Sequence, residues 1–403
     1  MRRVVITGAG TINPLGADIA ATQAAMRAGQ GAIAPLNVTD VDRLSIKIGA
    51  SVQGFDPNDH FSAKSLPLYD RFTQFALVAA RQAMQQSAPE LSEQEALSAG
   101  VIIGSSGAGL TTQDETYRAV FEGGKNRVHP FTVPRLMMSA PAAHISMEFG
   151  LRGPCFALSS ACASSNHAMI QALNMIRAGQ ADVMLTGGAD AMLCFGGIKA
   201  WEGLRVLSPD GCRPFDEARN GMVMGEGAAV FVFESYERAK ARGAVILAEV
   251  AGGCMTSDAS DIVMPDQASA ARAISGALKD AGLAPQDVGY INAHGTGTAA
   301  NDRVESAALR QSFGAAADEV LVSSTKAMHG HAIGAAGAIE LIACLMALNE
   351  GVIAPTINFE TSDPACDLDI VPNEARAQRV TAVLSNAFAF GGLNAVLALR
   401  NAV

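Results

Sequence analysis

The segment Phe156-Ala-Leu-Ser-Ser-Ala-Cys162-Ala-Ser-Ser-Asn-His167 joins an apolar run to a long apolar-periodic stretch that continues to Ile176. This pattern predicts a strand, a tight turn and a buried helix, with Cys162 at the helix amino terminus. The positive end of the helix dipole would stabilise a thiolate at that position. Because free cysteines are more often buried and inert, the residues around Cys162 identify a candidate nucleophile and no more.

The overall composition is that of a compact α/β enzyme. The chain has 403 residues, of which 49% are hydrophobic and 5% aromatic, enough for two domains or two fused halves. Its net charge of −10 argues against a general nucleic-acid binder. Seven scattered cysteines without CxxC spacing argue against a disulfide framework and favour a cytoplasmic location. The first apolar run is too short for a signal peptide, and the longest apolar segment, Ile339–Leu348, contains Glu340, so we expect no membrane insertion.

Short apolar runs alternate with helical patterns along the chain, which predicts mostly parallel sheets covered by helices. The strand candidates are 3–7, 100–104, 154–158, 183–186, 228–234, 247–251, 288–292, 321–323, 382–386 and 395–399, and the helix candidates are 71–86, 163–178, 269–281, 302–313 and 334–349. A charged segment, Ser235–Gly243, suggests a division into residues 1–242 and 243–403. Both parts contain a strand, then a turn with a candidate catalytic residue (Cys162 or His331), and then an Ala-rich helix. This repetition suggests a duplicated unit.

Two histidines lie in Gly-rich segments far from Cys162. The first is in Asn292-Ala-His294-Gly-Thr-Gly-Thr298, where Thr296 and Thr298 offer hydroxyls to a polar chain such as pantetheine. A structural histidine in a Gly-rich loop is the alternative. A reactive cysteine with two distant histidines, His294 and His331, suggests acyl-thioester chemistry.

The second histidine belongs to Ser323-Ser-Thr-Lys326-Ala-Met-His-Gly-His331-Ala-Ile-Gly-Ala-Ala-Gly337. We expect His331 to open the helix that carries Glu340, and Lys326 to pair with Glu340. A helix amino terminus disfavours imidazolium, so His331 should be neutral and able to donate a hydrogen bond. His329 and His331 have a spacing that metals use, but no third ligand accompanies them and we expect no metal.

Two further Gly-containing segments follow predicted strands. In Asn386-Ala-Phe-Ala-Phe390-Gly-Gly-Leu-Asn394, the glycines permit a turn that aims backbone N–H groups into a site, or a plain hairpin. Gly8-Ala-Gly10-Thr-Ile-Asn13 suggests a dinucleotide loop, but Asn13 replaces the required small residue and Pro14 follows. A dinucleotide-dependent enzyme is therefore disfavoured.

Taken together, these motifs resemble the β-ketoacyl-acyl-carrier-protein synthases of the KAS I/II type, condensing enzymes of the thiolase superfamily. The matches occur in the family's order and span essentially the whole chain. The resemblance implies an α/β, five-layered αβαβα fold made of two similar halves. The segments 248–252, 261–265 and 363–369 look closer to nodulation protein E-like members of the family.

The resemblance implies a decarboxylative Claisen condensation. Cys162 would carry an acyl chain, and His294 and His331 would donate hydrogen bonds to the thioester oxygen of malonyl-acyl carrier protein. Lys326 and Glu340 would act behind them, and the backbone N–H groups of Cys162 and Phe390 would form an oxyanion hole. Thr296 and Thr298 would hold the phosphopantetheine arm of the carrier, and no resident cofactor is implied.

Other residues are assigned by position within the family pattern. Gly107 and Trp201 fall in the acyl pocket, and Gly107, which replaces a bulkier residue, predicts a roomy pocket for long or rigid chains. The residues that match the carrier-protein docking patch are Lys64, Lys125, Arg127 and Arg205; solvated surface charge is the alternative. Pro67 and Leu68 replace neighbouring residues that are often basic, which suggests a specialised carrier.

The family resemblance leaves several functions open. The first is elongation of a fatty acid or specialised lipid by a homodimer, and the second is the ketosynthase of a type II polyketide or polyene system. A non-catalytic chain-length subunit is opposed by the presence of Cys162 with both histidines, although a heterodimer with such a subunit stays open. A thiolase using free coenzyme A is disfavoured because two histidines replace the second cysteine of that group.

Overall fold

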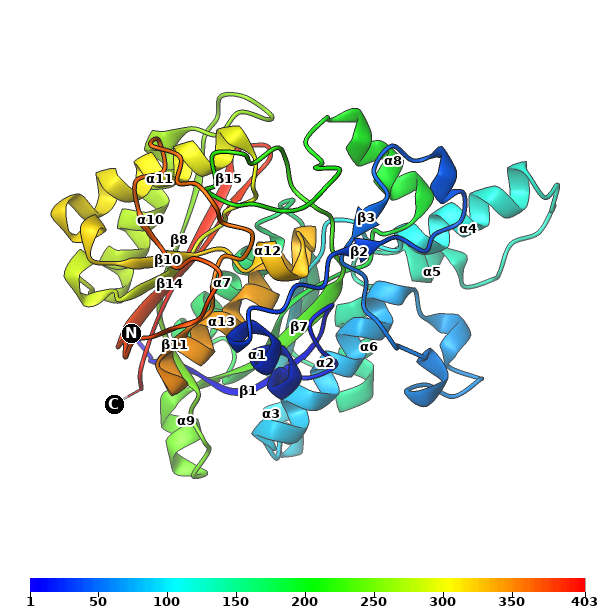
Figure 1. The fold of residues 1–403 in the computed structure, drawn as a ribbon. Coiled ribbons are helices and arrows are strands. Elements are labelled where there is room, and N and C mark those ends of the chain that lie inside the picture. The colour runs from blue at the N-terminus through cyan, green and yellow to red at the C-terminus, as the bar shows by residue number, and fades with distance from the viewer. Residues whose placement is uncertain (403) are drawn as a thin grey trace.

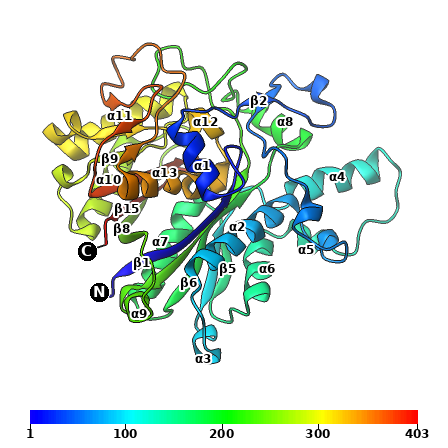
Figure 2. The same ribbon diagram turned by 60° about the horizontal axis from the view of Figure 1, so that its bottom comes forward.

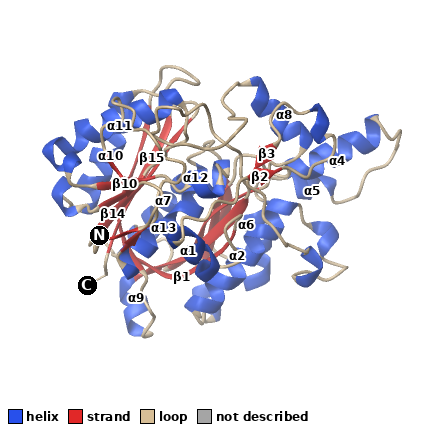
Figure 3. Ribbon diagram, viewed as in Figure 1, coloured by secondary structure: helices blue, strands red, loops and turns tan. Residues whose placement is uncertain are grey.

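The computed structural model describes residues 1–402, and its strands form one sheet with two small ribbons (Figures 1 and 3). The strands of the first half are β1 (Val4–Ile12), β4 (Gly100–Gly104), β5 (Cys155–Leu158), β6 (Val183–Asp190) and β7 (Gly227–Ser235). Those of the second half are β8 (Ala248–Ser257), β9 (Tyr290–Asn292), β10 (Leu321–Ser323), β12 (Asp369–Ile370), β14 (Ala382–Ala389) and β15 (Leu393–Arg400). The ribbons are β2 (Ala34–Pro35) with β3 (Ile48–Gly49), and β11 (Val352–Ile353) with β13 (Arg376–Ala377).

The sheet has eleven strands in the order β12-β10-β9-β14-β15-β8-β1-β7-β6-β4-β5, and two residue pairs between β1 and β8 join its halves. In the first half, β1 and β6 pair antiparallel with β7, and β4 pairs parallel with β6 and β5. In the second half, β8 and β14 pair antiparallel with β15, and β9 pairs parallel with β14 and β10. This repeat confirms two similar halves. The expectation of mostly parallel sheets was wrong, because the strands that connect the halves run antiparallel to their neighbours.

The helices complete five layers, because the two halves of the sheet enclose a pair of central helices and further helices cover their outer faces. Their bounds are α1 (Ile19–Arg27), α2 (Arg71–Ser87), α3 (Glu93–Ala96), α4 (Leu110–Phe121), α5 (Thr132–Leu136), α6 (Ala140–Phe149), α7 (Ser164–Arg177), α8 (Phe195–Gly203), α9 (Tyr236–Ala241), α10 (Gln267–Ala281), α11 (Ala299–Phe313), α12 (Lys326–His329) and α13 (Ala336–Glu350). Helices α7 and α13 contact each other and strands of both halves, and they form the central layer. Helices α2 and α6 cover the first half of the sheet, while α10 and α11 cover the second (Figures 1 and 2).

The local sequence pattern predicted where these helices occur more accurately than it predicted their first residues. Helix α7 begins at Ser164, so Cys162 lies in the turn before it. Helix α13 begins at Ala336, and a 3₁₀ turn at Ile333–Ala335 separates it from His331. His331 therefore does not open the helix that carries Glu340, contrary to the sequence-based expectation, because the chain makes an extra turn after it.

Helix α13 is the core of the central layer. Together with the 3₁₀ turn it gives an apolar helical stretch, Ile333–Glu350, that is long enough to cross a membrane, and 89% of that stretch is buried inside the protein. The apolar segment is longer than the Ile339–Leu348 identified from the sequence, because the turn extends the apolar run. Burial on all sides requires an apolar surface all round, which accounts for the composition of this helix.

The glycines of the first Gly-rich segment allow a helix to pack closely against β1. Gly8 and Gly10 lie inside β1, and a Cβ there would lie 2.2 Å from the carbonyl oxygen of Ala83 and 2.0 Å from that of Ala79, respectively. Glycine therefore allows α2 to approach the strand closely, which explains the motif without a dinucleotide.

Candidate active site

Cys162 lies in a strained turn between β5 and α7. The preceding residue, Ala161, has a φ of +48°, a conformation that side chains other than glycine rarely adopt. The Ser164 hydroxyl stabilises the turn by accepting from the Ser160 N–H at 2.9 Å and donating to the Ala161 carbonyl at 2.7 Å. This hydrogen bonding fixes the direction in which the thiol points.

The Cys162 thiol is neutral in the free protein. Its residue is 5% exposed, and burial raises the pKa of the thiol to about 12, although the charge of Lys326 acts in the opposite direction. The expected thiolate is therefore not the resting state, because removal of water from the sulfur outweighs the favourable field of the helix and of Lys326.

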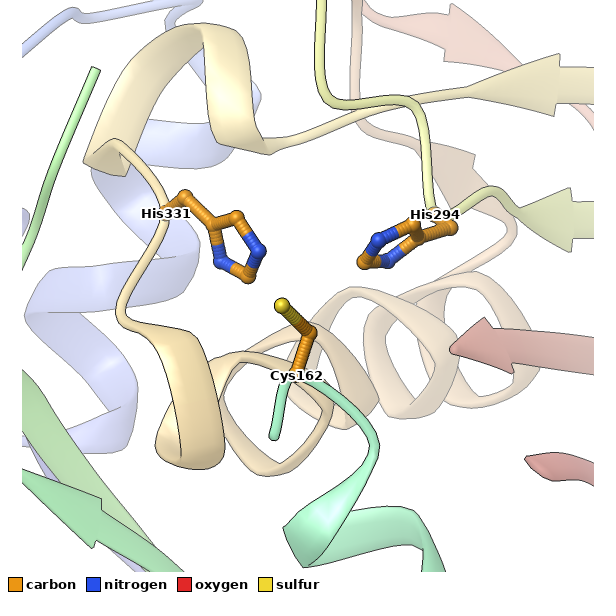
Figure 4. A group of neighbouring side chains, drawn as sticks. All are labelled: Cys162, His294 and His331. Carbon is orange, nitrogen blue, oxygen red and sulfur yellow. The ribbon is translucent and has the colours of Figure 1, made fainter. Parts of the chain in front are cut away.

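Two histidines from the other half of the chain converge on this thiol. The sulfur of Cys162 and one ring nitrogen each of His294 and His331 lie within 4.8 Å of one another (Figure 4). The two rings are 5.5 Å apart and nearly perpendicular, at 82°. Cys162 follows β5, His294 follows β9 and His331 follows β10 and α12. The duplicated topology brings the carboxyl ends of these parallel strands to one place, where such folds commonly bind ligands.

Lys326 sets the state of His294. Its ammonium group donates to the carbonyl oxygen of His294 at 2.6 Å and lies 3.5 Å from Nδ1 of the same residue. It also forms a fully buried ion pair with Glu340, as the sequence predicted. Because a cation faces Nδ1, we assign the ring proton to Nε2. Burial, and then the charge of Lys326, hold the pKa of His294 well below its usual value, so the ring is neutral.

His331 has the same protonation state for a different reason. The backbone N–H of Ile333 donates to its Nδ1 at 3.1 Å, which again leaves the proton on Nε2. Nε2 is buried without a hydrogen-bond partner among the described residues. Burial, followed by the charge of Lys326, lowers the pKa of His331 far below its usual value. Two neutral imidazoles therefore present N–H donors beside one sulfur.

Two carboxylates of α11 support the His294 loop: Asp302, to which the family resemblance gives a supporting role, and Glu305, which the sequence motifs did not single out. Glu305 accepts from the backbone N–H groups of His294 and Gly295, each at 2.8 Å, and Asp302 accepts from Thr296 at 3.1 Å. Burial raises the pKa of both, and that of Glu305 to about 7. Their spacing of three residues places them on one face of α11, and acidic residues at that spacing directly after a Gly-rich loop were the available signal.

The thiol and both histidines line a cavity of about 100 Å³. Thr296 and Thr298 line it as well, with their hydroxyls 2.9 Å apart. The remaining lining residues are largely apolar: Val206, Met222, Val263, Met264, Pro265, Ala300, Asn301, Phe388, Ala389 and Phe390. The segment Val263–Pro265 had not been assigned to the site, since nothing local distinguishes it from a surface loop.

Phe390 forms part of both a hairpin and the cavity wall. It precedes Gly391 and Gly392, whose φ angles of +81° and +66° make the turn between β14 and β15. Trp201 stacks on Phe390 at 6.0 Å and 27°, behind the wall rather than in it. The segment is therefore a hairpin and also part of the cavity wall, so the two interpretations made from the sequence do not exclude each other.

Gly107 also lies outside the cavity lining. A Cβ at this position would lie 2.4 Å from Cγ of Met192, so the Met192 side chain occupies the room that the missing side chain leaves. The absence of a side chain at Gly107 thus does not by itself enlarge the cavity in this structure.

The four basic residues expected to dock a carrier lie at the surface. Lys64, Lys125, Arg127 and Arg205 are all exposed, and none lines the cavity. Lys125 and Arg127 belong to the loop between α4 and α5, at the right edge of Figure 1. Exposure suits a docking role but equally suits solvated charge.

The geometry also bears on metal binding. A thiol and two imidazoles within 4.8 Å of one another are ligands that zinc accepts. The buried ammonium of Lys326 beside His294 opposes a second cation at the same place. His329, the other member of the His-x-His pair, bonds to the Thr325 hydroxyl at 3.0 Å and does not line the cavity.

Comparison with known proteins agrees with this fold and site. Residues 1–239 match the β-ketoacyl synthase N-terminal domain, and residues 247–360 match the β-ketoacyl synthase C-terminal domain. The chain therefore belongs to the β-ketoacyl synthase family, and it is a condensing enzyme that transfers acyl groups.

Individual relatives cover the full length. Nodulation protein E of Rhizobium leguminosarum bv. trifolii is 50% identical over 399 residues, and 3-oxoacyl-[acyl-carrier-protein] synthase 2 of Staphylococcus aureus (strain COL) is 40% identical over 406 residues. These alignments cover 99% of this chain and 99% and 98% of the relatives, respectively. The resemblance to nodulation protein E is thus confirmed over the whole chain.

Solved structures show the same fold. The ishigamide ketosynthase/chain length factor superposes with a TM-score of 0.95 at 35% identity, with full coverage of both chains. A type II polyketide ketosynthase in complex with its acyl-carrier protein (AntDE:AntF) superposes with a TM-score of 0.91 at 31% identity, again with full coverage.

Proposed function

We propose that this chain condenses malonyl-acyl carrier protein with an acyl chain bound to Cys162, in elongation of a fatty acid or specialised lipid. One observation carries the proposal: a thiol and two neutral imidazole N–H donors meet in a single buried cavity. This arrangement suits the formation of an enolate beside an acyl thioester, since neutral donors stabilise an oxygen anion without protonating the carbanion.

The first step loads Cys162. Its sulfur attacks the acyl thioester of the carrier, the bond to the pantetheine sulfur breaks, and the thiol proton ends on the released pantetheine. Because the resting thiol is neutral, the proton must leave as the new bond forms. The field of Lys326 favours the developing thiolate.

The second step uses the histidines. The malonyl thioester oxygen accepts hydrogen bonds from Nε2–H of His294 and of His331 while the bond to the carboxylate breaks and carbon dioxide leaves. The electrons of that bond form the enolate, whose negative oxygen the two donors stabilise. The pair Lys326–Glu340 keeps His294 in the required tautomer.

The third step forms the carbon–carbon bond. The enolate carbon attacks the acyl carbonyl on Cys162, and the backbone N–H groups of Cys162 and Phe390 stabilise the resulting oxyanion. Collapse of this intermediate breaks the bond to sulfur, releases the elongated β-ketoacyl carrier, and leaves Cys162 to regain a proton from water.

The carrier is a protein with a phosphopantetheine arm. Thr296 and Thr298 line the cavity next to the histidines, where their hydroxyls suit the amides of that arm. Lys64, Lys125, Arg127 and Arg205 form the proposed docking patch for an acidic carrier, and the structural relative solved with its acyl-carrier protein supports the class of partner. Reversal of charge at Lys64 and Arg205 together should weaken carrier binding, and unchanged binding would remove the patch from the proposal.

The functional unit is proposed to be a cytoplasmic homodimer. Strand β5 is an open edge of the sheet on which Cys155 and Phe156 are exposed, and an apolar edge of this kind is suited to pair with a second copy. All seven cysteines are free, which suits a reducing compartment. Light scattering of the purified chain tests the dimer, and a stable monomer would favour a heterologous chain-length subunit as partner.

A polyketide or polyene ketosynthase is the second candidate. It is favoured by the fold similarity to the ishigamide ketosynthase/chain length factor and to the type II polyketide ketosynthase. A non-catalytic chain-length subunit is opposed by the complete set of Cys162, His294 and His331. The primer and the carrier that the chain accepts separate these functions.

Intact-mass analysis after incubation with a panel of acyl-carrier proteins tests the proposal. We expect one acyl group on the parent chain, none on Cys162→Ala, and the parental result on Cys254→Ala, which removes a partly exposed thiol elsewhere. Addition of malonyl-carrier should then yield a β-ketoacyl product. Acylation that survives Cys162→Ala would overturn the assignment.

A further inference from the structure

The end of β6 carries a carboxylate that the mechanism above does not use. Asp190 is 1% exposed, and its two oxygens accept hydrogen bonds from four donors. They are the Ser105 hydroxyl at 2.7 Å and the backbone N–H groups of Ser106 at 3.0 Å, Gly107 at 2.9 Å and Gly334 at 2.7 Å. Three of these belong to the loop after β4, whereas Gly334 belongs to the segment after His331.

That segment contains a strained residue. Ile333 has a φ of +46°, and a β-branched side chain in this region is a conformational outlier. Such a conformation persists only where the surroundings hold it on both sides. On the amino-terminal side, the His331 N–H donates to Val223 at 2.7 Å and the His331 carbonyl accepts from Gly225 at 2.8 Å. On the carboxyl-terminal side, the hydrogen bond from Gly334 to Asp190 holds the chain.

The strained residue determines the state of a catalytic histidine. The N–H of Ile333 donates to Nδ1 of His331, and this bond leaves the proton on Nε2. His331 is held on one side and the buried helix α13 on the other, so Ile333 can reach an ordinary φ only if the Ala332–Ile333 peptide plane rotates as well. That rotation would turn the Ile333 N–H away from the ring. The His331 proton could then reside on either nitrogen.

We propose that Asp190 is a positioning residue for decarboxylation: by holding Gly334, it keeps Ile333 strained and so keeps the Nε2–H of His331 available to the substrate oxygen. This inference rests on the proposed function, and it adds a residue that makes no contact with the reacting atoms.

A carboxylate suits this role better than an amide. Four donors converge on Asp190, and an amide would place its own NH₂ group against at least one of them. There is also no room for adjustment, since a Cβ on Gly334 would lie 2.6 Å from Oδ2 of Asp190. An Asp190→Asn variant should therefore lose the bond to Gly334 or a bond to the loop after β4.

The test compares Asp190→Asn with Ser105→Ala in the full chain. Ser105→Ala removes a donor from the same carboxylate without touching Gly334, so it controls for the loop after β4. For each variant, ¹⁵N spectra of labelled histidine report the tautomer of His331, with the signal assigned by its loss in His331→Asn. Intact mass reports acylation of Cys162, and carbon dioxide release reports decarboxylation.

For Asp190→Asn we expect a mixture of His331 tautomers and a fall in kcat for decarboxylation of roughly 10- to 100-fold. KM for malonyl-carrier and the rate of Cys162 acylation should stay within about threefold of the parent, as should all rates of Ser105→Ala. A pure Nε2–H tautomer in Asp190→Asn, or an equal loss of acylation and decarboxylation, would overturn the inference.

A second variant addresses the strain directly. Glycine adopts a positive φ without strain, so Ile333→Gly should make the turn independent of Asp190. In that background, Asp190→Asn should slow decarboxylation less than about threefold further. Losses of equal size in both backgrounds would show that Asp190 acts by another route. Because the tautomer is read without substrate, failure of this inference is distinguishable from failure of the proposed function, which would appear as absence of acylation in the parent.

Discussion

Replacement of Lys326 by methionine should separate the electrostatic role of the buried ion pair from its role in stability. Methionine keeps the length and packing of the lysine stem but removes the ammonium group. Lys326 is fully buried, bonds to the carbonyl of His294 at 2.6 Å, and pairs with Glu340. Oε2 of Glu340 already lacks a hydrogen-bond partner among the described residues, so the variant leaves a buried carboxylate with nothing to compensate it.

The expected cost in stability follows from that loss. Removal of one partner from a buried ion pair costs about 3–5 kcal/mol, which for a chain of this size lowers Tm by roughly 4–6 °C. Burial already raises the pKa of Glu340 above its usual value, and loss of the lysine raises it further. The folded state then binds the proton more tightly than the unfolded state, so the deficit is largest near pH 8 and shrinks as the pH falls toward 5.

Activity should respond differently from stability. Without the ammonium group, Nδ1 of His294 loses its donor and the ring can adopt the wrong tautomer. Decarboxylation of malonyl-carrier should fall about 10²-fold, the loss typical of one oxyanion donor. In Lys326→Met combined with Glu340→Met, stability should return to within about 1–2 kcal/mol of the parent, because an apolar pair replaces the ionic one.

Carbon dioxide release and calorimetry on both variants provide the assay. The double variant should be stable and still slow, which would show that the ion pair serves the histidine rather than the fold. Recovery of the decarboxylation rate together with stability would refute this reasoning, and so would a parental rate in Lys326→Met.

Three further changes test other parts of the site. Alkylation of Cys162 by iodoacetamide should accelerate about tenfold per pH unit between pH 7 and 9, because burial raises the pKa of the thiol to about 12, and a plateau near neutral pH would contradict this. Met192→Ala should lengthen the acyl chains accepted in the mass assay, because Met192 fills the space beside Gly107, and an unchanged chain-length profile would show that the acyl channel runs elsewhere. Glu305→Gln should slow decarboxylation by roughly 10-fold, since an amide cannot accept from the backbone N–H groups of both His294 and its neighbour as the carboxylate does, and a parental rate would remove Glu305 from the support of the loop.

Much of the fold could be predicted from local pattern. The apolar runs identified strands such as β4 and β10 with their observed bounds, and the helical periodicity located α2, α7, α10 and α13 to within a few residues. The errors arose where a neighbouring element, rather than the local sequence, sets the structure. Strands β1 and β8 run antiparallel to β7 and β15, and these partners come from distant parts of the chain. The turn at Ile333 precedes α13 because residues from other segments hold it.

The residues of the site likewise divide into those that the sequence identified and those that only the structure revealed. Short motifs could be recognised individually around Cys162, His294, Lys326 and His331. Glu305 and Asp190 were given no role from the sequence, because their importance lies in backbone N–H groups that approach them from other segments. Gly107 suggested open space, but the side chain of Met192, 85 residues further along the chain, fills it.

The sequence alone determined the alternation of strands and helices, the duplicated organisation and the identity of the reactive groups, because periodicity and chemical type are properties of neighbouring residues. Only the tertiary structure decided that Cys162 rests as a neutral thiol, that both histidines hold their protons on Nε2, and that a carboxylate at the end of β6 restrains the segment after His331. Burial, Coulomb interaction and hydrogen bonding depend on distances between groups far apart in the chain, and folding sets those distances.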